Sequence, residues 1–254
     1  MTPEGKVAVV TGAGSGIGRA SAGALAKVGA RLLACDIDYE SAQQTVSAIE
    51  RNGGKAFALH ADVSKPDDVK RMIDAAVSRF GGLDILHNNA GILSGPRFPD
   101  SDPSCWMRAI SVNIMGVLSG IHYGTEAMRQ RGCGVIINTA SISGLKPHFS
   151  DPVYAATKAA VVNLTRSLAF LKKEANIRVN CICPGFVRTD LESHSAAVLD
   201  PEAQRRFRSR RAGFQDLPAL EPDDIARAVM MLINEDGLNG KACIVEPGEP
   251  WRVQ

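Results

Sequence analysis

The strongest constraint on the fold is a regular alternation between continuous apolar stretches and segments with helical periodicity. The apolar stretches, rich in Val, Ile, Leu and Ala, lie at 6–10, 31–35, 55–60, 83–87, 134–139 and 177–182. The helical segments lie at 17–28, 39–51, 67–80, 104–131 and 153–174. Strands that are apolar without alternation are typical of a parallel sheet that helices bury on both faces.

This alternation predicts the α/β class: a single-domain, Rossmann-type, doubly wound parallel sheet of about seven strands with helices on both faces. A seventh short strand is expected at 242–246, after a helix over 223–233 that begins next to Pro222. No linker or internal repeat divides the chain, so one domain is expected to span residues 1–254. The polar segment at 190–220 shows no strand pattern, and we interpret it as a substrate lid.

Composition and charge exclude several classes of protein. Hydrophobic residues make up 45% of the chain and charged residues 22%, which is ordinary globular usage and argues against disorder. The formal net charge of +2 is too small for a nucleic-acid-binding face. The apolar run at 7–10 leads straight into a turn and lacks the features of a signal peptide, and no apolar segment approaches a membrane span. A cytoplasmic protein with no nucleic-acid or membrane partner is expected.

The six cysteines and five histidines show no metal-binding pattern. The cysteines, at 35, 105, 133, 181, 183 and 243, include no C-x-x-C pair, so we expect reduced thiols that mostly fill the core. The histidines show no paired spacing of the kind that zinc sites use. The sequence therefore predicts no metal. A G-x-S-x-G nucleophile elbow is also missing around Ser15, which argues against a serine hydrolase.

A glycine-rich turn, TGAGSGIG at 11–18, follows the first apolar stretch, and a helix is expected immediately after it. Residues without side chains let a pyrophosphate approach backbone amides at a helix N-terminus, where the helix dipole favours negative charge. The turn departs from strict G-x-G-x-x-G spacing, because Gly18 comes one residue early. It predicts dinucleotide binding, and the alternative is a turn that only packs a strand on a helix.

Asp36 ends the second expected strand, where a carboxylate can accept hydrogen bonds from a ribose diol. The same charge would repel the 2′-phosphate of NADP, and neither Ser15 nor Ile37 supplies a compensating cation. Arg19 is a nearby cation, but it is expected to point to solvent. The predicted cofactor is therefore NAD rather than NADP.

Further polar and turn residues follow the other expected strands. They are Asp62, Asn89 with Gly91, Ser141, and Pro184 with Gly185. Because the carboxyl ends of parallel strands lie along one edge of a sheet, we expect these residues to line one crevice with the glycine turn. Taken singly, each of them could merely organise a turn.

Tyr154 and Lys158 are four residues apart in an expected helix, so their side chains share one face. An unperturbed tyrosine ionises near pH ~10, and a neighbouring ammonium favours the phenolate. The pair therefore predicts a general base that works near neutral pH. Ser141, on the loop after the fifth expected strand, can reach the same substrate oxygen.

Taken in order, these motifs resemble the short-chain dehydrogenase/reductase family over essentially the whole chain. The matching motifs are TGAGSGIG at 11–18, Asp62-Val63, Asn88-Asn89-Ala90-Gly91, Asn113, Ser141, Tyr154-x-x-x-Lys158 and Pro184-Gly185-Phe186-Val187-Arg188-Thr189. The resemblance implies an oxidoreductase that transfers hydride between a secondary alcohol or ketone and NAD(H).

The resemblance also assigns roles to residues. Tyr154 is the general acid or base, Ser141 fixes the substrate oxygen, and Lys158 also holds the nicotinamide ribose. Asn113 holds a water of a proton relay, and a solvent-facing asparagine is the alternative. The implied cofactor contacts are Gly12, Ser15, Gly16, Ile17, Gly18, Asp36, Ile37, Asp62, Val63, Asn89, Gly91, Tyr154, Lys158, Pro184, Gly185, Val187 and Thr189. The implied substrate contacts are Ser141, Asp151, Tyr154 and Phe186.

Within the family, the stretches at 134–154, 182–187 and 232–240 most resemble the NAD-dependent hydroxyprostaglandin dehydrogenase branch, which oxidises secondary alcohols on lipid-like molecules. Ser150 and Asp151 stand where that branch has two glutamines, one of which contacts substrate. Asp151 would favour a substrate with a hydrogen-bond donor or positive charge, or it points to solvent. The arginine run at 205–211 either grips an anionic substrate or forms a solvated helix face.

Two other functions stay open: an NADPH-dependent carbonyl reductase, and a non-catalytic dinucleotide-binding sensor or scaffold. The C-terminus lacks the Val-Asp-Gly-Gly ending that is frequent in tetrameric relatives. A homodimer through the helices at 104–131 and 153–174 is expected, with a homotetramer as the alternative. The identity of the alcohol depends on the loop at 92–105 and on the lid at 190–220.

Overall fold

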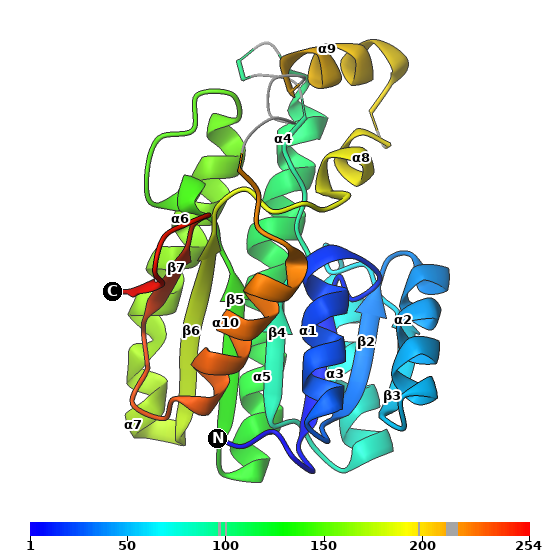
Figure 1. Cartoon of the computed structure of the whole chain (residues 1–254), viewed down its shortest axis with the longest axis vertical. Coiled ribbons are helices and arrows are strands. Elements are labelled where there is room, and N and C mark those ends of the chain that lie inside the picture. The colour runs from blue at the N-terminus through cyan, green and yellow to red at the C-terminus, as the bar shows by residue number, and fades with distance from the viewer. Residues whose placement is uncertain (96–97, 100, 198, 212–217) are drawn as a thin grey trace.

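The apolar stretches of the sequence form one eight-stranded sheet in a computed structural model of the chain (Figure 1). Residues 1–95, 98–99, 101–197, 199–211 and 218–254 are described, without the side chains of 208, 210 and 211. The strands are β1 (Val7–Thr11), β2 (Arg31–Asp36), β3 (Lys55–His60), β4 (Ile85–Asn88), β5 (Gly134–Thr139), β6 (Ile177–Pro184), β7 (Ala242–Val245) and β8 (Arg252–Val253). They lie in the order β3-β2-β1-β4-β5-β6-β7-β8.

The first seven strands pair in parallel, and only the β7–β8 pair is antiparallel. Val9 of β1 lies beside Leu33 of β2 on one side and Leu86 of β4 on the other. The predicted doubly wound α/β fold is confirmed. The sheet has one strand more than the expected seven, because β8 is a two-residue edge strand too short to give a sequence pattern.

The expected helices form, and two of the long ones are interrupted. The helices are α1 (Gly16–Lys27), α2 (Tyr39–Arg51), α3 (Pro66–Phe80), α4 (Pro103–Ile110), the π-helix η1 (Ser111–Met115), α5 (Gly116–Arg131), the 3₁₀ turn η2 (Ile142–Gly144), α6 (Pro152–Ser167), the 3₁₀ turn η3 (Leu168–Phe170), α7 (Leu171–Ala175), α8 (Leu191–Ala196), α9 (Pro201–Arg211) and α10 (Pro222–Asn234). The single helices expected at 104–131 and 153–174 are therefore wrong in detail, since η1 divides the first and η3 the second.

Two apolar cores lie on the two faces of the sheet. On one face, Val9 packs in a cluster that includes Met72 of α3 and Met128 of α5. On the other face, Val10 packs in a cluster that includes Leu25 of α1 and Leu232 of α10. Figure 1 shows α1, α2 and α10 together on this second face. Neighbouring residues of one strand thus serve opposite cores, as expected for a sheet covered on both sides.

The segment predicted as a lid, 190–220, contains α8 and α9 and no strand among its described residues. At its end, Leu220 forms an isolated bridge with Val187, which lies just before the segment. With α4, these helices lie beyond the carboxyl ends of the strands (Figure 1). Residues 198 and 212–217 of this segment lie outside the described residues.

One continuous helical stretch in the described part of the chain, Pro103–Arg131, is long and apolar enough by composition to cross a membrane. Its α5 portion places Val117, Ile121 and Met128 in the core under the sheet. This is the packing of a core helix in a globular domain.

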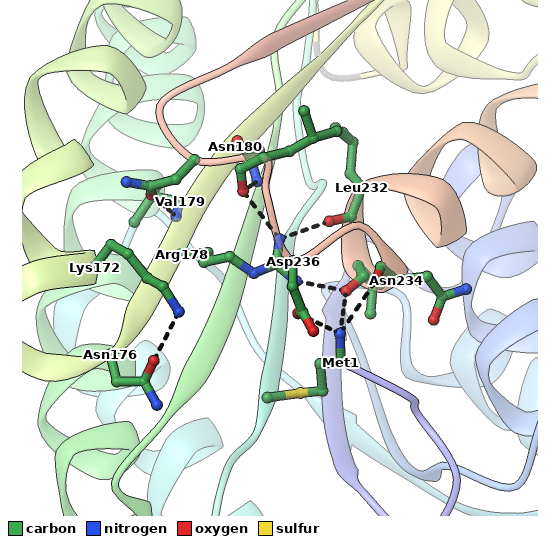
Figure 2. A network of polar contacts seen from close by, with 12 residues as sticks. Met1, Lys172, Asn176, Arg178, Val179, Asn180, Leu232, Asn234 and Asp236 are labelled. Carbon is green, nitrogen blue, oxygen red and sulfur yellow. Dashed lines mark hydrogen bonds and ion pairs between the residues drawn. The ribbon is translucent and has the colours of Figure 1, made fainter.

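Arg178 is a buried cation in β6 that the sequence did not single out. Its guanidinium donates hydrogen bonds to the carbonyl oxygens of Leu232 and Leu238 at 2.9 and 3.1 Å, and it lies 3.4 Å from Asp236 (Figure 2). The amino group of Met1 forms a second ion pair with Asp236 at 2.6 Å. Because carbonyl groups at a helix C-terminus lack intrahelical partners and carry partial negative charge, these cations anchor the end of α10 to the sheet.

Candidate active site

The glycine turn after β1 packs against the turns that follow β4 and β6. A Cβ at Gly18 would lie 1.9 Å from the carbonyl oxygen of Gly12 and 2.7 Å from Nδ2 of Asn89, so only glycine fits there. Gly16 has a φ of +48°, and a Cβ there would lie 3.0 Å from Cγ2 of Thr189. The turn residues from three strands predicted to line one crevice therefore touch one another.

Thr11 and Asn89 brace this junction. The Thr11 hydroxyl oxygen accepts hydrogen bonds from the backbone N–H groups of Asn89 and Ala90, both at 3.0 Å. The Asn89 amide donates to the carbonyl oxygen of Thr11 at 3.0 Å, and its Oδ1 accepts from the Thr139 hydroxyl at 3.2 Å. The side chain of Asn89 thus organises the turn, as the sequence alternative allowed, and a direct cofactor contact stays a prediction.

Asp36 is turned toward the glycine turn. One carboxylate oxygen accepts the backbone N–H of Gly14 at 2.8 Å, and the other accepts the N–H of Asp38 at 3.0 Å. The expectation that Arg19 points to solvent is correct in part. Although the residue is exposed, the guanidinium donates to the carbonyl oxygen of Gly14 and to the Thr45 hydroxyl.

Asp62 organises the turn before α3. Its Oδ1 accepts the backbone N–H of Ser64 at 3.0 Å and the Ser64 hydroxyl at 2.7 Å, and its Oδ2 lies 3.8 Å from the ammonium of Lys65. Val63 packs against α5, since a Cβ at Gly116 would lie 3.0 Å from Cγ2 of Val63. These contacts give both residues a structural role, and cofactor binding by either stays a prediction.

The turn after β6 is fixed by backbone hydrogen bonds. The N–H of Gly185 donates to the carbonyl oxygen of Val245 at 2.7 Å. The carbonyl oxygen of Phe186 accepts the N–H of Leu220 at 2.8 Å, and Val187 forms a bridge with the same leucine. The segment that enters α8 is therefore tied to Leu220, two residues before α10 begins.

Tyr154 and Lys158 lie on one face of α6. The Lys158 ammonium is buried, donates to the carbonyl oxygen of Thr139 at 2.8 Å, and lies 5.6 Å from the centre of the Tyr154 ring. Burial lowers the pKa of Lys158 to about 8, so the ammonium form still predominates at pH 7. A Cβ at Gly91 would lie 3.2 Å from Nζ, so the glycine leaves room for the ammonium.

Asn113 is fully buried in η1, so the alternative of a solvent-facing asparagine is wrong. Its Oδ1 accepts the N–H of Ile92 at 2.9 Å, and its Nδ2 donates to the carbonyl oxygen of Ile92 at 2.9 Å and to the Thr157 hydroxyl at 3.1 Å. π turns within α-helices are frequent at functional sites. Here the turn directs Asn113 between the segment after β4 and the helix that carries Tyr154.

Ser141 opens η2, where its hydroxyl oxygen accepts the N–H of Ser143 at 3.1 Å. The turn is seated on α6, because a Cβ at Gly144 would lie 2.6 Å from the backbone carbon of Lys158. All four residues predicted to carry catalysis are thus held by α6 or by segments packed on it.

The ring of Tyr154 packs against an apolar cluster formed by the lid helices and the segment after β4. Leu93, Ala196 and Phe207 are its buried members, and Leu191 packs beside them. In the arginine run, Arg206 is exposed and pairs with Glu202 at 2.8 Å, as on a solvated helix face. The side chains of 208, 210 and 211 lie outside the described residues.

Asp151 is 3% exposed, so the alternative that it points to solvent is wrong. It is the N-cap of α6 and accepts the N–H of Tyr154 at 2.9 Å. A groove of about 680 Å³ lies nearby, lined by Leu145, Phe149 and Ala156 among others. Ser141 and Tyr154 are not among the residues that line it.

Sequence reasoning missed the threonine hydroxyls that connect the site. Thr139, the last residue of β5, holds Lys158 through its carbonyl oxygen and Asn89 through its hydroxyl. Thr157 receives the amide of Asn113 and donates to the carbonyl oxygen of Tyr154 at 2.7 Å. Position at a strand end was the one signal for Thr139, and Thr157 carried none beyond its place between Tyr154 and Lys158.

Known proteins resemble the chain over most of its length. The cyclohexanol dehydrogenase of Acinetobacter sp. (strain SE19) is 37% identical over 91% of this chain and 88% of that protein. The 3β-hydroxysteroid dehydrogenase 1 of Eggerthella lenta is 38% identical over 96% of this chain and 94% of that protein. A short chain dehydrogenase/reductase from Burkholderia phymatum, solved in complex with NAD, has a TM-score of 0.86 at 29% identity and covers 97% of this chain and 90% of that one.

The family model described as short chain dehydrogenase matches residues 6–198, a range that holds the glycine turn, Asn113, Ser141, Tyr154 and Lys158. Because this match and the relatives span the site as well as the sheet, the chain belongs to the short chain dehydrogenase family of oxidoreductases.

Proposed function

We propose that the chain is an NAD-dependent enzyme that interconverts a secondary alcohol and its ketone, with Tyr154 as the general acid and base. The observation that carries this proposal is the buried Lys158 ammonium, which lies 5.6 Å from the centre of the Tyr154 ring on the same helix face. A cation beside a phenol favours the phenolate. The names of two relatives, a cyclohexanol and a hydroxysteroid dehydrogenase, agree with this substrate class.

The residues around the glycine turn fit a dinucleotide. The glycines keep the turn closely packed at the N-terminus of α1, because a Cβ at Gly18 would meet the carbonyl oxygen of Gly12 and a Cβ at Gly16 would meet Thr189. Backbone amides at such a helix N-terminus attract a pyrophosphate. The Asp36 carboxylate beside Gly14 suits a ribose diol and opposes a 2′-phosphate. Arg19 keeps its positive charge near this turn, and its guanidinium is directed to the carbonyl oxygen of Gly14 and to the Thr45 hydroxyl. The Asp36 carboxylate supports NAD over NADP.

In alcohol oxidation, NAD held by the glycine turn and Asp36 would supply the acceptor for the hydride of the carbinol carbon. The Tyr154 phenolate takes the proton of the substrate hydroxyl, and the Lys158 ammonium stabilises the phenolate beforehand. The Ser141 hydroxyl donates a hydrogen bond to the substrate oxygen. Asn113 braces Ile92 and Thr157 around this group and is proposed to serve the proton relay. In ketone reduction, Tyr154 returns the proton to the oxygen.

The apolar surroundings of Tyr154 support an uncharged, predominantly hydrocarbon substrate. Leu93, Ala196 and Phe207 form the buried cluster against which Tyr154 packs, and apolar ligand sites select by shape and apolar area. The Asp151 carboxylate is bonded within the protein and offers little to a substrate cation. Three expectations from the sequence stay predictions. They are the closer likeness to the hydroxyprostaglandin dehydrogenase branch, a cytoplasmic location, and the lack of metal, nucleic-acid and membrane partners.

The test is turnover of the purified chain with secondary alcohols, cyclohexanol among them, followed by absorbance of the reduced cofactor. We expect kcat/KM with NAD to exceed that with NADP by about tenfold or more, which corresponds to about 1.4 kcal/mol. Tyr154→Phe is expected to lower kcat by roughly 10²–10⁴-fold, the usual contribution of a general base, and to leave NAD affinity within about twofold.

Tyr123→Phe is the matched control, since this tyrosine lies in α5 against His122 and outside the catalytic set. Strong preference for NADPH would favour the carbonyl reductase. Binding of NAD without turnover of any alcohol, and with no effect of Tyr154→Phe, would favour the non-catalytic sensor.

A further inference from the structure

Asp151 joins the helix that carries Tyr154 to the segment after β4. Its buried carboxylate accepts the backbone N–H of Tyr154 through Oδ1 at 2.9 Å and the backbone N–H of Ser94 through Oδ2 at 3.0 Å. The Ser94 hydroxyl donates to Oδ1 as well. One side chain therefore holds together two segments that are 57 residues apart in the sequence.

The segment at 92–94 is held residue by residue from three different elements. Ile92 is bonded to Asn113 of η1, and the N–H of Leu93 donates to the hydroxyl of Ser195 of α8 at 3.0 Å. Ser94 is bonded to Asp151 at the start of α6. Of these three anchors, Asp151 is the charged one, and it also bonds the backbone of the catalytic tyrosine. Leu93, between the anchors, is a buried member of the cluster beside Tyr154.

We infer that Asp151 is a positioning residue for the reaction, and this inference rests on the proposed function. It fixes the apolar segment at 92–94 against the first turn of α6, and so sets how substrate meets the Tyr154 hydroxyl. In all three hydrogen bonds the Asp151 side chain is the acceptor. A carboxylate can accept through both of its oxygens, whereas an amide of the same shape accepts through one atom and donates through the other. With both oxygens engaged, the carboxylate acts through its bonds to Tyr154 and Ser94 rather than on the substrate.

The decisive variant is Asp151→Asn, because it keeps the shape and turns an NH₂ group toward a backbone N–H. We expect kcat/KM for the alcohol to fall at least tenfold while KM for NAD stays within twofold, because the glycine turn and Asp36 are outside this network. Ser94→Ala removes the hydroxyl bond and keeps both N–H bonds, so a several-fold loss is expected. In the double variant the loss should be smaller than the two single losses combined, since both residues act in one network.

Hydrogen exchange gives a readout that does not depend on turnover. The amides of Leu93, Ser94 and Tyr154 are expected to exchange faster in Asp151→Asn. In Ser94→Ala the amide of residue 94 is expected to exchange faster by a smaller factor, because its bond to Oδ2 remains but the hydroxyl bond that helps to hold the carboxylate is lost. If Asp151→Asn fails to fold, Ser94→Ala still decides the question. Wild-type exchange together with wild-type kcat/KM in Ser94→Ala would then overturn the inference.

Asp224→Asn is the matched control for loss of a helix cap. Asp224 accepts the N–H of Glu221 at 2.7 Å in the capping box of α10, and no hydrogen bond among the described residues links it to 92–94 or to α6. We expect it to lower thermal stability without changing kcat/KM. Equal losses in Asp224→Asn and Asp151→Asn, or additive losses in the double variant, would overturn the inference. Lack of turnover in the wild type would instead count against the proposed function, and exchange would still test Asp151.

Discussion

At the scale of single residues, Thr139 lies between two buried bases in different charge states. Its carbonyl oxygen accepts from the Lys158 ammonium at 2.8 Å, and its hydroxyl lies 2.9 Å from Nε2 of His87. Burial lowers the pKa of Lys158 to about 8 and that of His87 to about 3. Near pH 7 the lysine keeps the charge that the proposed mechanism requires beside Tyr154, while the histidine is neutral and bonds without adding a second cation.

The neutral state of His87 makes stability depend on pH. Because the folded pKa is about 3 and the unfolded pKa is near 6.5, the unfolded chain binds more protons between these values. The free energy of unfolding contributed by His87 is fully present above pH 6.5, and it is lost toward pH 3 by up to about 1.4 kcal/mol per pH unit. Urea unfolding at several pH values between 7 and 5 should therefore show a shallower decline for His87→Asn than for the wild type.

His60→Asn, at an exposed position at the end of β3, is the matched control and is expected to keep the wild-type slope. Parallel profiles for His87→Asn and the wild type between pH 7 and 5 would show that His87 is protonated in the folded protein.

Sequence reasoning at this scale succeeded where partners are close along the chain. Tyr154 and Lys158 are one helical turn apart, so their common face follows from helix geometry alone. It failed where partners are distant, as for Asp151 and Ser94, whose contact needs the packing of α6 on the segment after β4. The two alternatives weighed for Asp151 both assumed a side chain facing outward, and neither anticipated a buried carboxylate satisfied by backbone N–H groups.

At the scale of elements, the glycine turn and α1 offer a sharp contrast between two glycines of one helix. Gly18→Ala would bring a Cβ to within 1.9 Å of a backbone oxygen, whereas a Cβ at Gly23 meets nothing within 4 Å. We expect Gly18→Ala to destabilise by roughly 1–3 kcal/mol or more through overpacking and to abolish NAD binding. Gly23→Ala should stabilise by about 0.5–1 kcal/mol, because alanine favours a helix interior.

Urea unfolding and calorimetric titration with NAD measure both effects on the same pair of proteins. Gly18→Ala binding NAD as well as Gly23→Ala does would mean that the turn shifts easily, and the turn could not then be the rigid cradle proposed for the pyrophosphate.

Elements were predictable in kind but not in their interruptions. The apolar pattern of 104–131 fits a regular α-helix and also a helix with one wider π turn. The sequence pattern therefore could not predict η1. The cause of the π turn is tertiary: the bonds of Asn113 to Ile92 and Thr157 hold its side chain toward α6. The same holds for β8, whose two residues pair with β7 only because the chain returns to that edge.

At the scale of the whole molecule, strand order places the site. The chain runs from β1 outward to β2 and β3, and then returns to β4 on the other side of β1. The chain therefore leaves β1 and β4 in opposite directions, and the gap between their following turns is the topological switch point, where ligands bind in open α/β sheets. The alternation of strands and helices predicted a common edge for the site residues, but not this order, because alternation does not say which strands are neighbours.

The outer face of the helical stretch Pro103–Arg131 bears on assembly. Met115 is 44% exposed and Leu118 is 38% exposed, although both lie beside the residues that bury α5 in the core. An exposed apolar patch on a folded domain is a candidate interface, and in a twofold dimer each substitution acts twice because the same patch occurs on both subunits. The homodimer through this face stays a prediction, with a homotetramer as the alternative.

Leu118→Arg is therefore expected to shift the mass measured by light scattering from that of a dimer or tetramer toward a smaller species, because it places two like charges in the contact. Val28→Arg changes an equally exposed apolar residue at the end of α1, on the opposite face of the sheet, and is expected to keep the wild-type mass. A wild-type mass for Leu118→Arg would exclude this helix face as the contact. A reduced mass with unchanged kcat/KM would show that each subunit holds a complete site, as expected when Asn113, Ser141, Tyr154 and Lys158 all come from one chain.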